Sequence, residues 1–66
     1  MISYAPLWET MKACGITTYT LQVKGISSST IRRLKAGESV STNTLDALCQ
    51  IIGCTLADIV EFLPEE

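Results

Sequence analysis

The alternation of apolar and polar positions predicts a chain of short helices separated by glycines. Residues 28–36 show the pattern most clearly, because Ile31 and Leu34 lie on one apolar face and the remaining positions are small or charged. Ser27 suits the N-cap, where its hydroxyl accepts a free backbone N–H of the first turn. Gly37 suits the left-handed residue that often ends a helix. The sequence therefore predicts one helix here with a defined start and end.

The same pattern predicts four further helices and one pair of short strands. The first helix begins at Pro6 and ends at Gly15, the second is capped by Thr17 or Thr18 and continues through Lys24, the fourth opens at residues 41–44 and ends at Gly53, and the fifth opens at residues 55–58. Residues 2–4 alternate in the way a short strand does, and residues 61–63 are the candidate partner strand. We therefore expect an all-α fold of five short helices, with a small two-stranded sheet formed by the two ends.

Length and composition narrow the range of functions. The 66 residues, 47% of them hydrophobic, correspond to one domain over residues 1–66 with its own core. There is no run of 18 apolar residues and no charged-then-apolar leader, so we expect a cytoplasmic protein that neither spans a membrane nor is secreted. The absence of histidine and of a phosphate-binding glycine loop predicts no catalytic residues, no enzyme activity and no cofactor.

The three cysteines are Cys14, Cys49 and Cys54, an odd number without a close pair. A zinc site would lack a fourth conventional ligand, so we expect free thiols that serve as small apolar residues and no metal site. Cys14 and Cys49 fall on apolar helix stripes and are expected to be buried, with Cys54 partly buried.

The net charge of −2 conceals a strong asymmetry along the chain. All five basic residues lie between residues 10 and 37, where there is no acid, whereas six of the seven acids lie between residues 38 and 66. The local charge, not the total, determines where a polyanion binds. The middle of the chain is therefore the candidate DNA-binding region.

The exposed side of the helix at residues 28–36 fits a DNA major groove. It presents Ser29, Ala36, Arg32 and Arg33; small residues allow close approach, and an arginine can bind guanine O6 and N7 with two hydrogen bonds. The alternative is an ordinary solvated surface helix, since charged outer faces are common.

The second and third predicted helices, joined by a turn containing Gly25, form a helix-turn-helix. With three further short helices they resemble the Cro and phage-repressor (Xre-like, lambda-repressor-like) DNA-binding family over nearly the whole chain. The residues that carry the resemblance are Gly15-Ile16-Thr17, Leu21, Gly25-Ile26-Ser27, Ser29-Thr30-Ile31, Leu34 to Gly37, Thr44-Leu45, Leu48, Ile52 and Leu56-Ala-Asp-Ile59. The opening Ile-Ser-Tyr-Ala-Pro-Leu-Trp resembles a small bacterial or mobile-element branch of this family.

The resemblance implies roles for individual residues. Base edges are expected to meet Ser28, Ser29 and Arg33, with Arg32 beside them, and phosphates are expected to meet Thr17, Thr18, Lys35, Ser41, Thr42 and Asn43. The chain departs from the family in having three residues, not four, between Leu21 and Gly25, which predicts a shorter second helix or a tighter turn.

The family commonly binds two half-sites as a two-fold dimer. The residues expected at the dimer interface are apolar and C-terminal: Leu56, Ile59, Val60, Phe62 and Leu63. The leading hypothesis is a sequence-specific transcriptional regulator that binds double-stranded DNA as a homodimer. The alternative is a protein–protein adaptor or antitoxin-like partner, with an unidentified protein partner, on the same scaffold.

Overall fold

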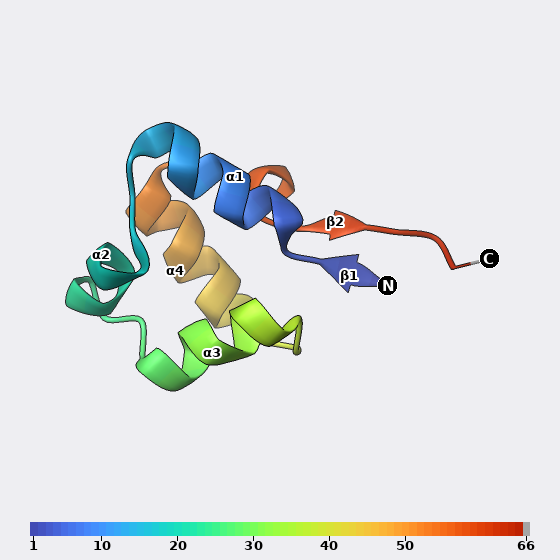
Figure 1. The fold of residues 1–66 in the computed structure, drawn as a ribbon, viewed down its shortest axis with the longest axis horizontal. Coiled ribbons are helices and arrows are strands. Elements are labelled where there is room, and N and C mark those ends of the chain that lie inside the picture. The colour runs from blue at the N-terminus through green and yellow to red at the C-terminus, as the bar shows by residue number, and fades with distance from the viewer. Residues whose placement is uncertain (66) are drawn as a thin grey trace.

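The structure, a computed structural model that describes residues 1–65, contains four α-helices, one 3₁₀ turn and a two-stranded sheet (Figure 1). In chain order these are β1 (Ile2–Ser3), α1 (Ala5–Cys14), α2 (Thr18–Val23), α3 (Ser28–Ala36), α4 (Thr42–Ile52), the 3₁₀ turn η1 (Leu56–Asp58) and β2 (Glu61–Phe62). No helix in this part of the chain is long and apolar enough to cross a membrane.

The expectation of a fifth helix is wrong, because the chain leaves the helical path after a single turn at η1. The carboxylate of Asp58 accepts hydrogen bonds from the backbone N–H and the hydroxyl of Thr55, both at 3.1 Å. Two residues beyond Ile59 the backbone is already paired in β2. The pairing with β1 therefore replaces further helical turns.

The sheet joins the two ends of the chain, as predicted for residues 2–4 and 61–63. The strands are antiparallel, with Ile2 opposite Phe62 and Ser3 opposite Glu61. Met1 and Leu63 extend the pairing, since each donates its N–H to the carbonyl of the other, at 2.7 and 2.8 Å. Both termini consequently lie on one side of the molecule, away from α2 (Figure 1).

The helices surround one hydrophobic core to which each of them contributes. The fully buried side chains are Leu7, Leu21, Leu34, Leu48 and Ile59. Burial of each such side chain contributes about 1.5–3 kcal/mol to folding. Trp8 is half-buried and packs against the edge of this core. The helical periodicity of the sequence thus identified one fully buried leucine in each of the four helices.

Three helices begin with the same hydroxyl arrangement. At α2, α3 and α4 the N-cap side chain accepts the backbone N–H of the residue three positions on, and the two hydroxyls also contact each other; the pairs are Thr17 with Thr20, Ser27 with Thr30, and Ser41 with Thr44. Each cap satisfies one of the backbone donors that the first helical turn leaves free.

The four helices also end alike. After each helix, the residue that follows a glycine donates its backbone N–H to the carbonyl of the residue five positions earlier, as in a Schellman motif. The bonds run from Ile16 to Met11, from Ile26 to Leu21 and from Glu38 to Arg33, each at 2.9 Å, and from Cys54 to Cys49 at 3.1 Å. The motif needs a left-handed residue, which Gly37 (φ 75°) and Gly53 (φ 78°) supply without a side-chain penalty. A contact between the paired side chains often accompanies the motif, and the pairs at α1 and α2 are packed in or against the core.

Candidate nucleic-acid interface

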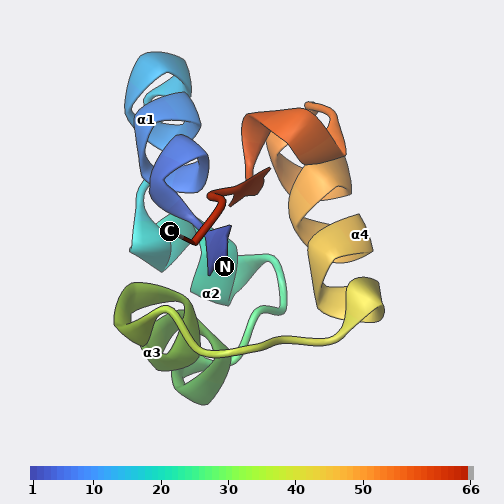
Figure 2. The same ribbon diagram turned by 90° about the vertical axis from the view of Figure 1, so that its right-hand side faces the viewer.

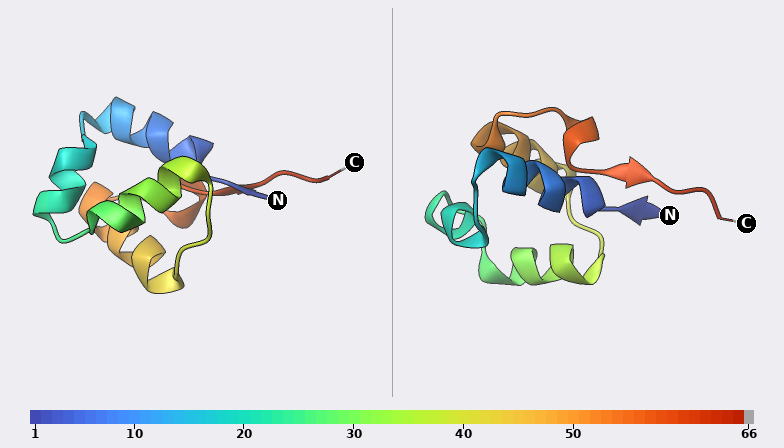
Figure 3. Two further views of the ribbon diagram at one scale, coloured as in Figure 1. Left: turned by 60° about the horizontal axis from the view of Figure 1, so that its bottom comes forward. Right: turned by 45° about the horizontal axis from the view of Figure 1, so that its top comes forward.

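Helix α3 lies along the outside of the molecule and presents one polar face. Ile31 and Leu34 are 4% and 1% exposed and hold the helix against the core. Figure 3 shows α3 at the surface, with α2 beside its N-terminal end. The four residues expected to meet base edges, Ser28, Ser29, Arg32 and Arg33, are all exposed on α3. The structure therefore brings the whole expected base-reading set to a surface that is open to a large ligand.

The turn between α2 and α3 fixes the direction of this face. Leu21 and Ile26 are both buried, and the backbone N–H of Ile26 donates to the carbonyl of Leu21 at 2.9 Å. Gly25 supplies the positive φ (110°) of the turn. Helix α2 has six residues, which agrees with the short second helix expected from the Leu21 to Gly25 spacing. The α2–turn–α3 unit is a helix-turn-helix.

The opposite end of α3 is held as firmly. The hydroxyl of Tyr4 donates to the backbone carbonyl of Glu38 at 2.9 Å, which links the start of α1 to the loop after α3. Arg33 and Lys35 lie in the last turn of α3, where a positive charge complements the negative end of the helix dipole. Both are exposed.

The N-terminal turns carry the residues expected to contact phosphate. Thr17, Ser41, Thr42 and Asn43 are exposed, and Thr18 is half-buried. The first turns of α2, α3 and α4 contain no acidic residue, so no carboxylate of their own complements the positive end of these helices. The start of α4 lies on the same side of the molecule as α3 (Figure 2). This side therefore combines the N-terminal turn of α4 with helix α3.

Within α3 the hydroxyl groups support one another. The hydroxyl of Ser27 contacts that of Ser29 at 3.2 Å and that of Thr30 at 2.8 Å. The side chain of Ser29 is thus held toward the cap, whereas Ser28 lies just outside this cluster on the exposed first turn. The two serines consequently differ in how freely their hydroxyls can reorient toward a base.

Tyr19 is an exposed residue of this region for which the sequence predicted no role. It is 72% exposed and directly follows Thr18 at the start of α2, and Val23 on the same helix is 64% exposed. Each is two positions from Leu21, or about 200° around the helix, so the helical period alone places both outward.

The residues expected at a dimer interface divide into two groups. Leu56, Phe62 and Leu63 are 52%, 69% and 40% exposed, and Val60 is half-buried. Ile59, by contrast, is 0% exposed and belongs to the core of the single chain. Its inclusion in the interface is wrong, because the turn after η1 directs it inward while its neighbours stay near the surface.

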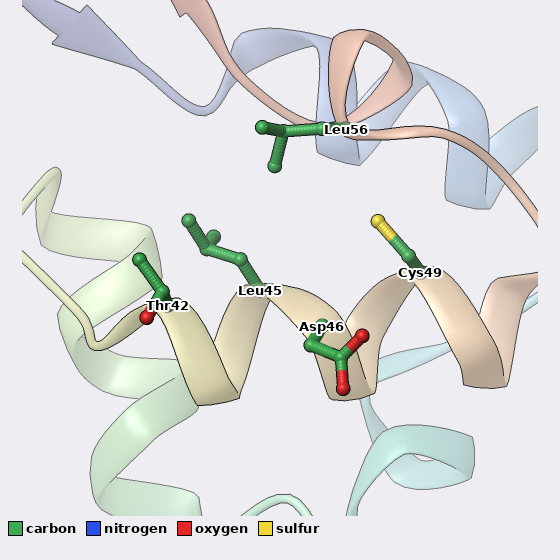
Figure 4. A pocket seen from close by; sticks show the side chains of 5 residues that line it. All are labelled: Thr42, Leu45, Asp46, Cys49 and Leu56. Atoms are coloured by element: carbon green, nitrogen blue, oxygen red, sulfur yellow. The ribbon is translucent and has the colours of Figure 1, made fainter.

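Apolar surface at this end of the molecule is more extensive than the expected set. Met1 and Ile2 are 61% and 53% exposed on the neighbouring strand. A cavity of about 440 Å³ lies beside them, lined by Ile2, Tyr4, Gly37, Ser39, Val40, Leu45, Leu56 and Val60. A second cavity of about 270 Å³ lies between α4 and η1, lined by Thr42, Leu45, Asp46, Cys49 and Leu56 (Figure 4).

All three cysteines carry free thiols, and two of them, Cys14 and Cys49, are less buried than expected. Cys14 is exposed, so the expectation that it is buried is wrong. It is the last residue of α1 and lies beyond the buried positions Leu7 and Met11 of that helix. Cys49 and Cys54 are half-buried. Residues 1–65 contain no group of three side chains that could hold a metal ion.

A helix-turn-helix with an exposed basic face is typical of a DNA-binding fold. The comparisons with known proteins agree. The profile of the Cro/C1-type HTH DNA-binding domain matches residues 6–65, and the chain therefore belongs to the Cro/C1-type helix-turn-helix family. This family is a DNA-binding fold and not an enzyme class.

A solved structure is similar over nearly the full length. The crystal structure of the transcriptional regulator VanUg superposes with a TM-score of 0.86 at 34% identity, covering 97% of this chain and 87% of that one. No curated protein matches the chain in sequence.

Proposed function

We propose that this chain is a sequence-specific transcriptional regulator that reads an operator by inserting α3 into the DNA major groove. The observation that carries the proposal is the exposed face of α3, on which Ser28, Ser29, Arg32 and Arg33 stand together without an acidic neighbour on the helix. The family to which the chain belongs and the similarity to a transcriptional regulator support the same reading. Arg33 reads a guanine edge through its planar fork, and Arg32 contacts either a base or a phosphate beside it.

Phosphate contacts hold α3 in position. The residues that make them are Thr17, Thr18, Ser41, Thr42, Asn43 and Lys35, at the starts of α2 and α4 and the end of α3. Backbone N–H groups and hydroxyls at a helix start bind an anion without regard to base sequence. The absence of acid from these first turns favours that use.

The functional form is a homodimer that meets two half-sites. In the pairing of β1 with β2, Met1 and Leu63 exchange both backbone hydrogen bonds, so the next pair, Ile2 with Phe62, is a non-hydrogen-bonded pair. The N–H and carbonyl of Phe62 therefore point away from β1, toward the other edge of β2. The sheet has two strands in the described part of the chain, so that edge is available for a third strand.

A two-fold axis at this edge gives both the N–H and the carbonyl of Phe62 a hydrogen-bond partner. If β2 pairs antiparallel with its copy, Phe62 stands opposite Phe62 of the partner subunit and the two exchange N–H···O bonds. Glu61 then faces Leu63 of the partner subunit, so no acid opposes its own copy. Leu56, Val60, Phe62 and Leu63 form the apolar contact, and two α3 helices about 34 Å apart would fit successive turns of one DNA face.

The test is binding of operator and random DNA by matched variants over a salt series, with the operator taken from selection of bound genomic fragments. Arg33→Ala should weaken operator binding by about 1–3 kcal/mol, roughly 5- to 150-fold, and relax preference at one base pair. Lys12→Ala is the control, because Lys12 is also an exposed cation but lies on α1, outside the helix-turn-helix. It should change affinity for both DNAs little.

Two results would contradict the proposal. If Arg33→Ala weakened binding to both DNAs equally and left base preference intact, α3 would not be the recognition helix. No effect on either DNA would mean that this face does not meet DNA, and the protein–protein adaptor would replace the regulator. Wild-type affinity must also fall with rising salt, because phosphate binding releases counterions.

A further inference from the structure

The C-terminal end of α4 holds two thiols side by side. The backbone N–H of Cys54 donates to the carbonyl of Cys49 at 3.1 Å, which closes the Schellman motif around Gly53. A contact between the first and last side chains of the closed turn often accompanies this motif. The equivalent pairs after α1 and α2, Met11 with Ile16 and Leu21 with Ile26, are packed in or against the core. At α4 the equivalent pair is Cys49 with Cys54, so both members carry a thiol, and the Cys49 thiol lies close enough to affect the pKa of Cys54.

The two thiols differ in environment. Cys49 lines the cavity between α4 and η1, and Figure 4 shows its sulfur pointing from α4 toward the side where η1 lies. The pKa of the Cys54 thiol is raised above its usual value, chiefly by burial and then by the neighbouring Cys49 thiol and the carboxylate of Asp58. The raised pKa lowers the thiolate fraction of Cys54 at neutral pH, and Cys49 lines a cavity that admits a small reagent.

We propose that Cys49 and Cys54 are a dithiol modification site that closes to an intramolecular disulfide on exposure to hydrogen peroxide. The Cys49 thiolate attacks one peroxide oxygen, the O–O bond breaks, and hydroxide leaves, so that Cys49 becomes a sulfenic acid. Cys54 then loses its proton and attacks the sulfur of Cys49, which forms the S–S bond and expels a second hydroxide. The thiol pair gives up two electrons, peroxide accepts them, and the products are the disulfide and two waters.

Trypsin separates this pair from the third cysteine. The last basic residue is Lys35, so residues 36–66 form one peptide that contains Cys49 and Cys54, whereas Cys14 lies on the peptide between Lys12 and Lys24. Peroxide treatment of the folded protein, alkylation of the remaining thiols and mass measurement should show the 36–66 peptide unalkylated and lighter by two hydrogen atoms. Cys14→Ser should give the same product, because Cys14 is not part of the pair, and Cys49→Ser and Cys54→Ser should give no bridge within that peptide.

A rate comparison separates the folded geometry from the short loop between the two residues. The bridge should form on the order of tenfold faster in the folded chain than in the same chain unfolded in urea, since the fold holds the two sulfurs together. Equal rates in the two states would overturn the proposal. So would a main product that joins Cys14 to another cysteine, a disulfide between two chains, or stable oxidation of Cys49 without a bridge. Restoration of both thiols by dithiothreitol would support it.

Discussion

Replacement of Phe62 by alanine is expected to weaken the proposed dimer by roughly 30- to 1,000-fold. Complete burial of a phenylalanine side chain contributes about 1.5–3 kcal/mol, and 69% of Phe62 is exposed in the single chain. Covering that fraction contributes about 1–2 kcal/mol per copy. Two-fold symmetry places two copies in one interface, so Phe62→Ala should cost about 2–4 kcal/mol of association free energy, which gives the stated range.

Sedimentation velocity over a concentration series without DNA measures this change directly. Tyr19→Ala is the matched control, because Tyr19 is an aromatic residue with 72% exposure on α2, far along the molecule from the sheet (Figure 1). The control should associate like the wild-type protein. The reasoning fails if the wild-type chain stays monomeric at micromolar concentration, if Phe62→Ala associates normally, or if Tyr19→Ala weakens association equally.

Other expected outcomes concern stability, phosphate contact and the thiols. Ser27→Ala should lower the free energy of unfolding by about 1 kcal/mol through loss of the α3 cap, measured by urea denaturation. In the same assay Leu21→Ala should cost about 2–5 kcal/mol, whereas Val23→Ala, 64% exposed on the same helix, should cost under about 0.5 kcal/mol. Thr18→Glu and Thr42→Glu should weaken binding to operator and random DNA alike, because phosphate contacts carry no sequence information. A loss of affinity for the operator alone would assign these residues to base reading. A chelator or a reductant should change neither folding nor DNA binding. Loss of either property on adding EDTA would reveal a metal site.

The sequence predicted what local interactions determine. The cap at Ser27 and the inward positions Ile31 and Leu34 depend on residues within a few positions of one another, and all three are as expected. The short strands were also predicted, since the alternation at residues 2–4 is visible in the chain, but the register of Ile2 with Phe62 comes from the structure alone.

The errors share a different physical cause. Ile59 and Val60 are equally apolar neighbours, and only the path of the chain between η1 and β2 decides that Ile59 is buried. Cys14 lies on the correct helical stripe but beyond the point where other elements cover it. The burial of Ile59 and the exposure of Cys14 are both determined by tertiary packing, which the helical periodicity does not encode. The residues expected to meet base edges were predicted from the helix face and from the family resemblance, and the structure adds that all four are exposed.

The pairing of Met1 with Leu63 has a consequence for the order in which the molecule forms. It connects residues 62 positions apart, so nearly the whole chain lies inside one closed loop. Closing such a loop in an unstructured chain would cost about 4 kcal/mol or more of entropy, which disfavours early formation of the sheet. Helix packing shortens the effective separation first, and the strands then meet at small additional cost. The edge of β2 is therefore complete only in chains folded from end to end, and association through it would select against partly folded copies.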